Sequence, residues 1–215
     1  MTSGELLALF RSEMNDVETP YLWSDSEVYG YIDDAQKMFC RKTDGISDAT
    51  KSKVVNINVV PGDDWVKTHP SIKLIRRATR VDTGRPIDVI NNQDMLDRGW
   101  YFDGSTGTVK ALVIGEEQYK AQVYPVSNET MTIRLLVYRM PLELIEGDQD
   151  FEIPEKHHRH LLLWVKSLAY LKQDTETYDK SKANDFEGRF LAYCEQSMLE
   201  DRKEKHKTRI VRYGG

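Results

Sequence analysis

Hydrophobic residues recur at helical spacing near the start of the chain. Residues 2–14 carry an apolar stripe behind a capping box formed by Thr2 and Glu5, which predicts a short first helix. A second capping box, Ser24 with Glu27, opens a longer helical pattern that ends near residue 45. Its apolar stripe consists of Val28, Ile32, Ala35 and Phe39. We therefore predict two N-terminal helices, the second long enough to pack along a partner helix.

The spacing changes to strict alternation near residue 52. Val55, Ile57 and Val59 alternate with asparagines, which predicts a half-buried strand. Further strands are predicted at residues 74–81, 87–90, 109–113, 119–123 and 131–137, with a short helix at 92–98. Short alternating strands joined by polar turns favour an antiparallel sheet. The middle of the chain is therefore predicted to form a β-rich unit inserted between helices.

Helical spacing returns in the last third of the chain, after an acidic connector over residues 141–153. Pro154 fits the first position of a helix, and the run that follows it is apolar on nearly every face, as in a helix buried on several sides. A last helix is predicted to begin near Asp174 or Thr175. Its apolar stripe consists of Ala183, Phe186, Phe190, Tyr193, Cys194, Ser197 and Met198. The final residues carry too little apolar surface to fold alone.

The predicted fold class is α+β: an antiparallel helical bundle with an inserted antiparallel β-rich unit and an extended C-terminal tail. Its parts are the N-terminal helices (1–50), the β-rich unit (51–141), the C-terminal helices (142–206) and the tail (207–215).

Composition fits a globular protein, since 40% of the 215 residues are hydrophobic and 30% are charged. The first 13 residues have neither a basic segment nor a long apolar run, so we expect no secretory signal, no membrane span and assembly in a cytoplasm. Two cysteines make no disulfide framework, and we expect Cys40 and Cys194 to be reduced and buried.

Charge is unevenly distributed along the chain. Residues 202–213 carry six basic residues and one acid, a net charge of +5, so the rest of the chain carries −10 of the total of −5. A general nucleic-acid-binding protein usually has a basic body, which disfavours that class here. The pattern instead predicts a basic tail that finds a separate acidic or polar surface.

Candidate chemistry is sparse, and no catalytic residue, metal or cofactor is predicted. Residues 62–68 resemble a phosphate-binding loop, but Val66 stands where the motif needs a glycine. His157 and His160 are three residues apart and could share a metal, yet a polar first helical turn is the favoured interpretation. The acids of the connector could pair for glycoside hydrolysis, but we expect them to be solvated, where nothing would raise a pKa.

Arginines in the second predicted strand, Arg76, Arg77 and Arg80, with Trp65 nearby in sequence, could contact nucleic acid by charge and stacking. A subunit interface or a solvated strand face is the commoner role of such residues.

The order of parts resembles the adaptor proteins of tailed bacteriophages, also called head-to-tail connector or head completion proteins. The resemblance rests on residues 23–35 (WSDSEVYGYIDDA), 153–158 (IPEKHH) and 168–177 (LAYLKQDTET), followed by the basic tail, and it spans nearly the whole chain. It implies a structural, non-enzymatic virion protein in the neck or tail region. Such proteins form a homo-oligomeric ring, usually dodecameric, beneath the portal protein.

The same resemblance implies a role for each part. The ring extends the channel through which genomic DNA passes without sequence-specific binding, and it offers a platform for tail attachment. The β-rich unit would hold nozzle or fibre proteins. The portal-binding tail would consist of Lys207, Thr208, Arg209, Ile210, Val211, Arg212 and Tyr213.

Two alternatives stay open. A nucleic-acid-binding accessory protein would use the basic tail and the strand arginines. A cell-wall hydrolase carried by the tail would use a carboxylate pair, and the solvated setting of the acids makes it the weaker alternative.

Overall fold

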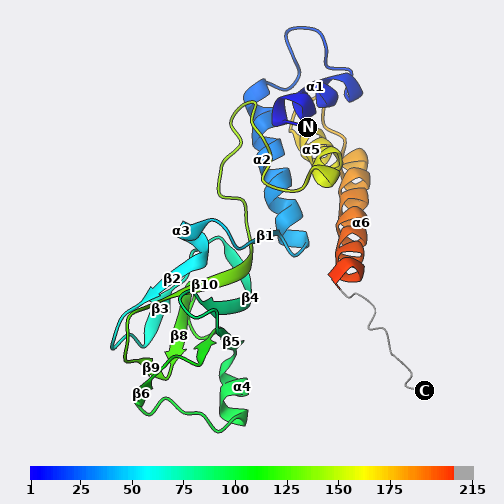
Figure 1. The fold of residues 1–215 in the computed structure, drawn as a ribbon. Helices are drawn as coiled ribbons and strands as arrows, with labels where there is room; N and C mark the ends of the chain where they lie inside the picture. Colours follow the sequence, from blue (N-terminus) through cyan, green and yellow to red (C-terminus); the bar gives the residue numbers. More distant parts are fainter. Residues whose placement is uncertain (206–215) are drawn as a thin grey trace, which may run out of the picture. The chain divides into compact units, whose positions relative to one another are not determined.

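A computed structural model describes residues 1–205, and the chain divides into two compact units (Figure 1). The helical unit comprises Met1–Gly45 and the residues from Pro141 onward, and the β-rich unit comprises Ile46–Met140. The predicted mixed α+β class is therefore confirmed.

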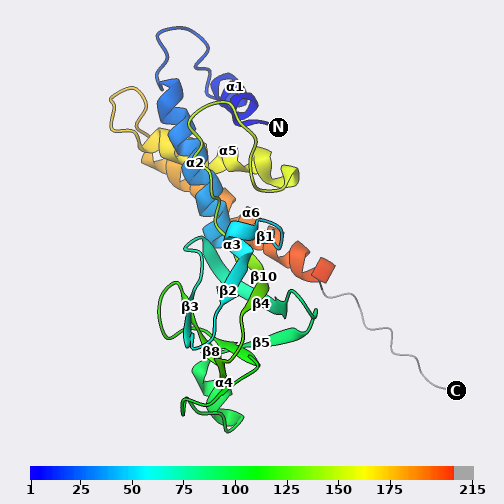
Figure 2. The ribbon, with the colours of Figure 1, turned by 60° about the vertical axis from the view of Figure 1, so that its left-hand side comes forward.

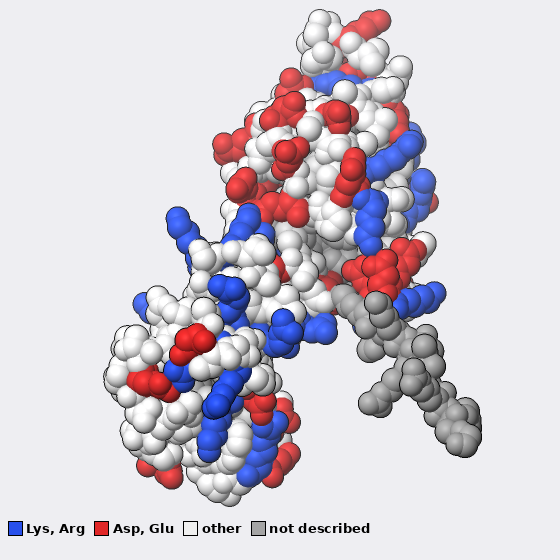
Figure 3. Space-filling model, viewed as in Figure 1, with Lys and Arg blue, Asp and Glu red and all other residues white. Residues whose placement is uncertain are grey.

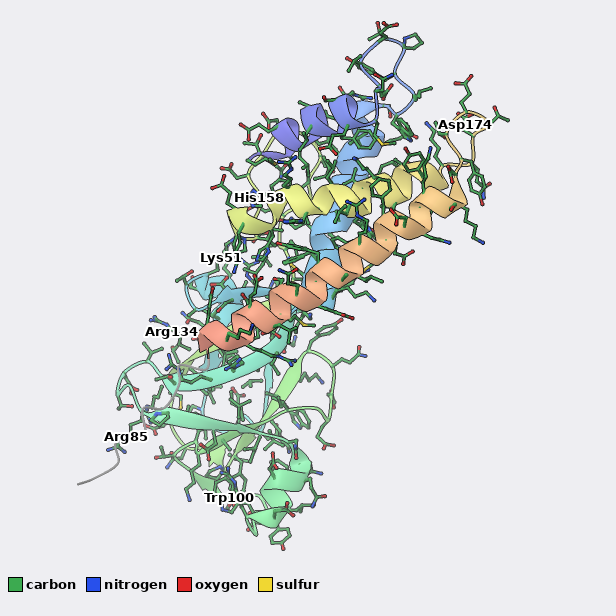
Figure 4. All side chains as sticks on the ribbon, turned by 90° about the vertical axis from the view of Figure 1, so that its right-hand side faces the viewer. Lys51, Arg85, Trp100, Arg134, His158 and Asp174 are labelled. Carbon is green, nitrogen blue, oxygen red and sulfur yellow. The ribbon has the colours of Figure 1, made fainter. Side chains whose placement is uncertain are left out.

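The helical unit contains the elements α1 (Ser3–Glu13), α2 (Asp25–Lys42), η1 (Glu155–His157), α5 (His158–Leu171) and α6 (Lys180–Lys205). Both predicted capping boxes are present, with Thr2 accepting a hydrogen bond from the Glu5 N–H and Ser24 accepting one from the Glu27 N–H. Helix α5 packs against α1, α2 and α6 and lies between α1 and α6 (Figures 2 and 4). Its fully buried Leu161 and Val165 place α5 at the centre of this unit's core.

The last helix begins later than its apolar pattern predicts, at Lys180 rather than near Asp174 or Thr175. Asp179 provides the reason, because its side chain accepts the Lys182 N–H and its carbonyl accepts the Ala183 N–H, as a capping residue does. Asp174 instead closes a turn by accepting the Tyr178 N–H at 3.1 Å. Pro154 likewise precedes a 3₁₀ turn, and α5 starts at His158.

The β-rich unit contains ten strands and two short helices. Its elements are β1 (Ile46–Asp48), α3 (Ser52–Val55), β2 (Asn56–Val59), β3 (Trp65–Lys67), β4 (Ile72–Arg80), β5 (Pro86–Ile90), α4 (Asn92–Asp97), β6 (Thr106–Gly107), β7 (Ala111–Val113), β8 (Lys120–Tyr124), β9 (Val126–Ser127) and β10 (Met131–Arg139). Eight strands form one sheet in the order β1-β10-β4-β5-β7-β8-β3, with β2 also on β10, while β6 pairs with β9.

This unit departs from the prediction in two places. Residues 52–55 form a helical turn, so the first long strand starts only at Asn56. The sheet is not purely antiparallel, because β5 pairs with β7 in parallel, and so does β6 with β9. The connection from β5 to β7 contains α4 and is long enough for a crossover, which returns the chain in the same direction.

The core of the β-rich unit follows the alternation of its longest strand. Ile133, Leu135 and Val137 of β10 are buried on one face. Arg139 continues β10 into this interior, where its side chain and that of Asp48 are each 4% exposed and form an ion pair at 2.7 Å. The two cysteines lie in the helical unit and are buried, as predicted.

Candidate docking surfaces

The histidines at the start of α5 contact neighbouring groups of the helical unit, and His157 and His158 are buried. His157 Nδ1 lies 2.8 Å from the Tyr193 hydroxyl, and His160 stacks on the same tyrosine ring. Burial, with a smaller effect of the Lys156 charge, lowers the pKa of His157 to about 4. Both ring nitrogens of His158 lie within 2.9 Å of backbone carbonyl oxygens, those of Met1 and Ile153.

These contacts give each of the three histidines a partner within the helical unit. Among residues 1–205, no group of three or more His, Cys, Asp and Glu side chains could hold a metal ion.

The acids of the connector are solvated as expected, since Glu143, Glu146, Asp148 and Asp150 are exposed, but its backbone is hydrogen-bonded to the rest of the helical unit. The Glu152 carboxylate accepts the backbone N–H groups of Leu142 and Glu143, and the Ile145 N–H donates to Asp33 on α2. Asp148 accepts the N–H of Gly4 at the start of α1. Hydrogen bonds from Thr2 and then from Gly4 lower the pKa of Asp148, which is the wrong direction for a general acid.

A basic groove of about 380 Å³ lies in the helical unit between the end of α1, α5 and α6. Its lining combines three cations with apolar side chains: Arg159, Lys166, Arg189, Leu162, Leu163 and Phe186. Glu13 enters the groove from α1 and pairs with Lys166 at 2.5 Å. The Lys166 ammonium and the Arg189 guanidinium both lie over the Phe186 ring, at 5.2 and 5.4 Å from its centre.

The strand arginines of the β-rich unit do not act together. Arg80 is held by two acids, Asp82 at 2.6 Å and Glu129 at 2.6 Å. Arg76 lies at a bulge in β4 next to Arg77, and both are exposed, with Arg76 reaching the Tyr138 hydroxyl at 3.1 Å. Trp65 lies on β3, four places from β4 in the sheet order, so it does not join them.

A third exposed arginine, Arg134 of β10, completes the arginine face of the sheet with Arg76 and Arg77. Arg134 is opposite Thr79 of β4 in register, and Arg77 is opposite Leu136. Sequence reasoning missed Arg134, although its polar position in the alternating β10 pattern already placed it outside the core. Leu74, beside these arginines on β4, is 46% exposed.

A separate cavity of about 340 Å³ in the β-rich unit is lined by Arg85, Lys110 and Trp100, among others. Arg85 and Trp100 are labelled in Figure 4. Trp100 stacks on Tyr124 with ring centres 5.1 Å apart.

The predicted portal-binding residues, Lys207 to Tyr213, lie outside the described residues. Helix α6 extends to Lys205, two positions before Lys207.

A family comparison supports the adaptor interpretation. The model of the SU10 adaptor protein family matches residues 1–212. The chain belongs to the SU10 adaptor protein family. It is thus related to phage head-to-tail adaptors over nearly its whole length. No curated protein matches it. Within residues 1–205 of this adaptor, no helix is both long and apolar enough to cross a membrane.

The acidity of this adaptor-family chain is confined to one unit. The described part of the helical unit has 14 Lys and Arg against 24 Asp and Glu, a net charge of −10. The β-rich unit has 13 against 11, a net charge of +2. Figure 3 shows acidic side chains crowding the α2 side of the helical unit, and basic side chains gathered over parts of the β-rich unit.

Proposed function

We propose that the chain is a structural protein of the virion neck, assembled in the host cytoplasm, which forms a dodecameric ring beneath the portal. The ring extends the DNA channel and provides the platform for tail attachment. The observation that carries this proposal is the match of the SU10 adaptor protein family to residues 1–212. The role is structural and needs neither cofactor nor catalysis.

In this proposal residues 1–50 and 142–206 form an antiparallel helical bundle that builds the ring wall. The net charge of −10 in the described helical unit supports this assignment. Phosphates are repelled by such a surface, so DNA passes without being gripped or read. Residues 51–141 carry the tail-facing platform for nozzle or fibre proteins, and the exposed arginine face of the sheet is a surface that such partners can use.

The tail, residues 207–215, docks on the portal. An Arg-Ile-Val-Arg-Tyr segment can add a strand to a partner's sheet or fill pockets, while its arginines bind carboxylates in a bidentate manner. Docking through this segment makes assembly sequential, because the portal must be present first.

The test is co-sedimentation of the chain with the portal protein of the same phage. The full chain is expected to sediment with the portal, and a chain truncated after residue 206 is expected to stay in the supernatant. A matched control keeps residues 207–215 in scrambled order, which preserves charge and composition. If the scrambled tail restores binding, charge alone docks the chain. If no form binds, the proposed function is wrong.

A second candidate function, nucleic-acid binding, is favoured by one observation, the cavity of the β-rich unit that combines Arg85 and Lys110 with Trp100. It predicts salt-dependent DNA binding without portal that weakens in an Arg85→Glu/Lys110→Glu variant. A chain that joins the portal and shows no DNA mobility shift at low salt excludes this candidate.

A further inference from the structure

The turn over residues 142–149 forms a hydrogen-bonded acidic knuckle on the helical unit. Leu144 at its tip is 52% exposed, while the adjacent Ile145 is buried. Glu143 and Glu146 flank Leu144 and are exposed. The Glu152 carboxylate holds the base of the knuckle, and the Gln149 amide donates to the Leu144 carbonyl at 3.0 Å. A large exposed apolar side chain on a hydrogen-bonded turn between two acids is a feature that a complementary surface can bind.

The basic groove has the complementary properties. Its apolar lining, Leu163 and Phe186 among it, can receive an aliphatic side chain. Three cations surround that lining, and two acids pair with them: Glu13 with Lys166 at 2.5 Å and Arg159 at 3.9 Å, and Asp185 with Arg189 at 3.7 Å. The side chains of Arg159 and Arg189 are 74% and 59% exposed and their ion pairs are long, so each can also reach an incoming carboxylate.

The knuckle and the groove of one chain cannot meet each other. The knuckle is bonded to the first residues of α1, through Ser3 and Gly4, whereas the groove contains Glu13 at the other end of α1. At 1.5 Å per residue, the ends of α1 are about 15 Å apart. The connector passes on the α2 side of the helical unit, and α6 lies on its other side (Figure 1).

We propose that the acidic knuckle of one copy docks in the basic groove of the next copy, with Leu144 against Leu163 and Phe186. This inference rests on the proposed function and names the contact that closes its ring. Two different complementary patches on one chain make a heterologous interface, which generates a ring when its rotation closes. Glu143 and Glu146 would pair with Arg159 and Arg189, which adds direction and register to the apolar contact.

Cysteine cross-linking on the portal tests this contact in the full chain. The native cysteines are buried, so a Leu144→Cys/Leu163→Cys variant has two accessible thiols, one in the knuckle and one in the groove. After assembly and oxidation it is expected to give a ladder of covalent multimers. A mixture of the two single variants is expected to stop at the dimer. The matched control is Leu144→Cys/Leu199→Cys, because Leu199 is exposed on α6 but does not line the groove.

Charge reversal gives an independent readout. Arg159→Glu/Arg189→Glu is expected to reduce the number of copies retained on the portal about tenfold, because like charges then face each other. Adding Glu143→Lys/Glu146→Lys in the same chain is expected to restore retention. The matched control is Glu116→Lys/Glu117→Lys, in the β7–β8 turn of the β-rich unit. It changes the net charge by as much as Glu143→Lys/Glu146→Lys and is expected to leave retention unchanged.

These experiments distinguish a failure of the knuckle–groove contact from a failure of the proposed function. A cysteine ladder together with rescue by the second reversal supports the contact. A wild-type ring on the portal with no ladder, or reversal variants that assemble normally, overturns the contact and leaves the proposed function standing. If the wild-type chain does not join the portal, the proposed function is wrong, and this contact falls with it.

Discussion

The two units of the chain differ in how they carry charge. The described helical unit has a net charge of −10, and the β-rich unit has a net charge of +2, although a whole-chain count makes the protein look uniformly acidic outside its tail. The acidic surface that repels phosphate therefore belongs to the helical unit only. The β-rich unit has a slightly basic surface, which suits partners that carry acidic groups.

The interiors of the two units differ in their titratable groups. Both units bury an ion pair, Asp48 with Arg139 in the β-rich unit and Asp16 with Arg11 in the helical unit, but the helical unit also buries an imidazole, His157, whose neutral form is favoured. The two units should therefore respond differently to mutation and to acid. Each unit has two tryptophans, so replacing Trp65 and Trp100 by Phe leaves reporters for the helical unit, and replacing Trp23 and Trp164 leaves reporters for the β-rich unit.

The largest expected effect is in the β-rich unit. Arg139→Met leaves the buried Asp48 carboxylate without its cation and should lower the free energy of unfolding by about 3–5 kcal/mol. Denaturant unfolding followed by Trp65 and Trp100 measures it. The matched control is Arg98→Met, whose partner Asp88 is half exposed, and about 0–1 kcal/mol is expected there. Equal losses in both variants would show that burial of the Asp48–Arg139 pair is unimportant.

The second effect belongs to the helical unit and to mild acid. The folded pKa of His157 is about 4, below its unfolded value near 6.5, so the unfolded chain binds the proton first as pH falls. Stability is fully present above about pH 6.5 and should decrease by about 3 kcal/mol toward pH 4. His157→Phe should flatten this dependence, followed by Trp23 and Trp164. An unchanged pH slope in that variant would assign the titration to another group.

The β-rich unit should resist mild acid and weaken only at lower pH. Burial alone would raise the pKa of Asp48, but hydrogen bonds from the Thr50 N–H, the Arg139 side chain and the Lys51 N–H outweigh it and lower the pKa to about 2. Because this folded pKa lies below the unfolded value, the stability is present above about pH 4 and is lost toward pH 2, by about 2 kcal/mol. Asp48→Asn should abolish this acid-dependent part. Coincident acid transitions in the two units would contradict the comparison.

The smallest effect tests a helix cap. Ser24→Ala removes the side chain that accepts the Glu27 N–H at the start of α2 and should cost about 1 kcal/mol in the helical unit. The β-rich unit should be unaffected, because its own capping box is Asn91 with Asp94 on α4. Thermal unfolding with each tryptophan pair measures both. A shift in the β-rich unit would mean that the two units unfold together.

Local signals in the sequence predict much of the fold. The capping boxes of Thr2 and Ser24 and the stripe that includes Phe190 and Cys194 depend on neighbouring residues, and the structure has them. The start of α6 and the parallel pairing of β5 with β7 cannot be predicted from the spacing of apolar residues alone. Asp179 competes with Asp174 as a cap, and strand direction follows from the path of the connection through α4.

Docking surfaces are harder to predict, because they bring together residues that are far apart in sequence. The basic groove combines Glu13 with Arg159 and Phe186, and no sequence window contains all three. The acidic connector is visible in the sequence as charge, but its hydrogen bonds with Asp33 of α2 and Gly4 of α1 form only in the folded chain. The assignment to the adaptor proteins succeeded because it rested on the order of parts over the whole chain, which the family match to residues 1–212 confirms.

The central claim, that the chain closes a ring on its portal, is tested most directly by the mass that it adds to the isolated portal. Native mass spectrometry with the chain in excess gives this mass. The account predicts one saturated species, heavier than the portal by a fixed whole number of chains, with few partly filled forms. No added mass, or a broad series of increments that grows with chain concentration, would contradict it.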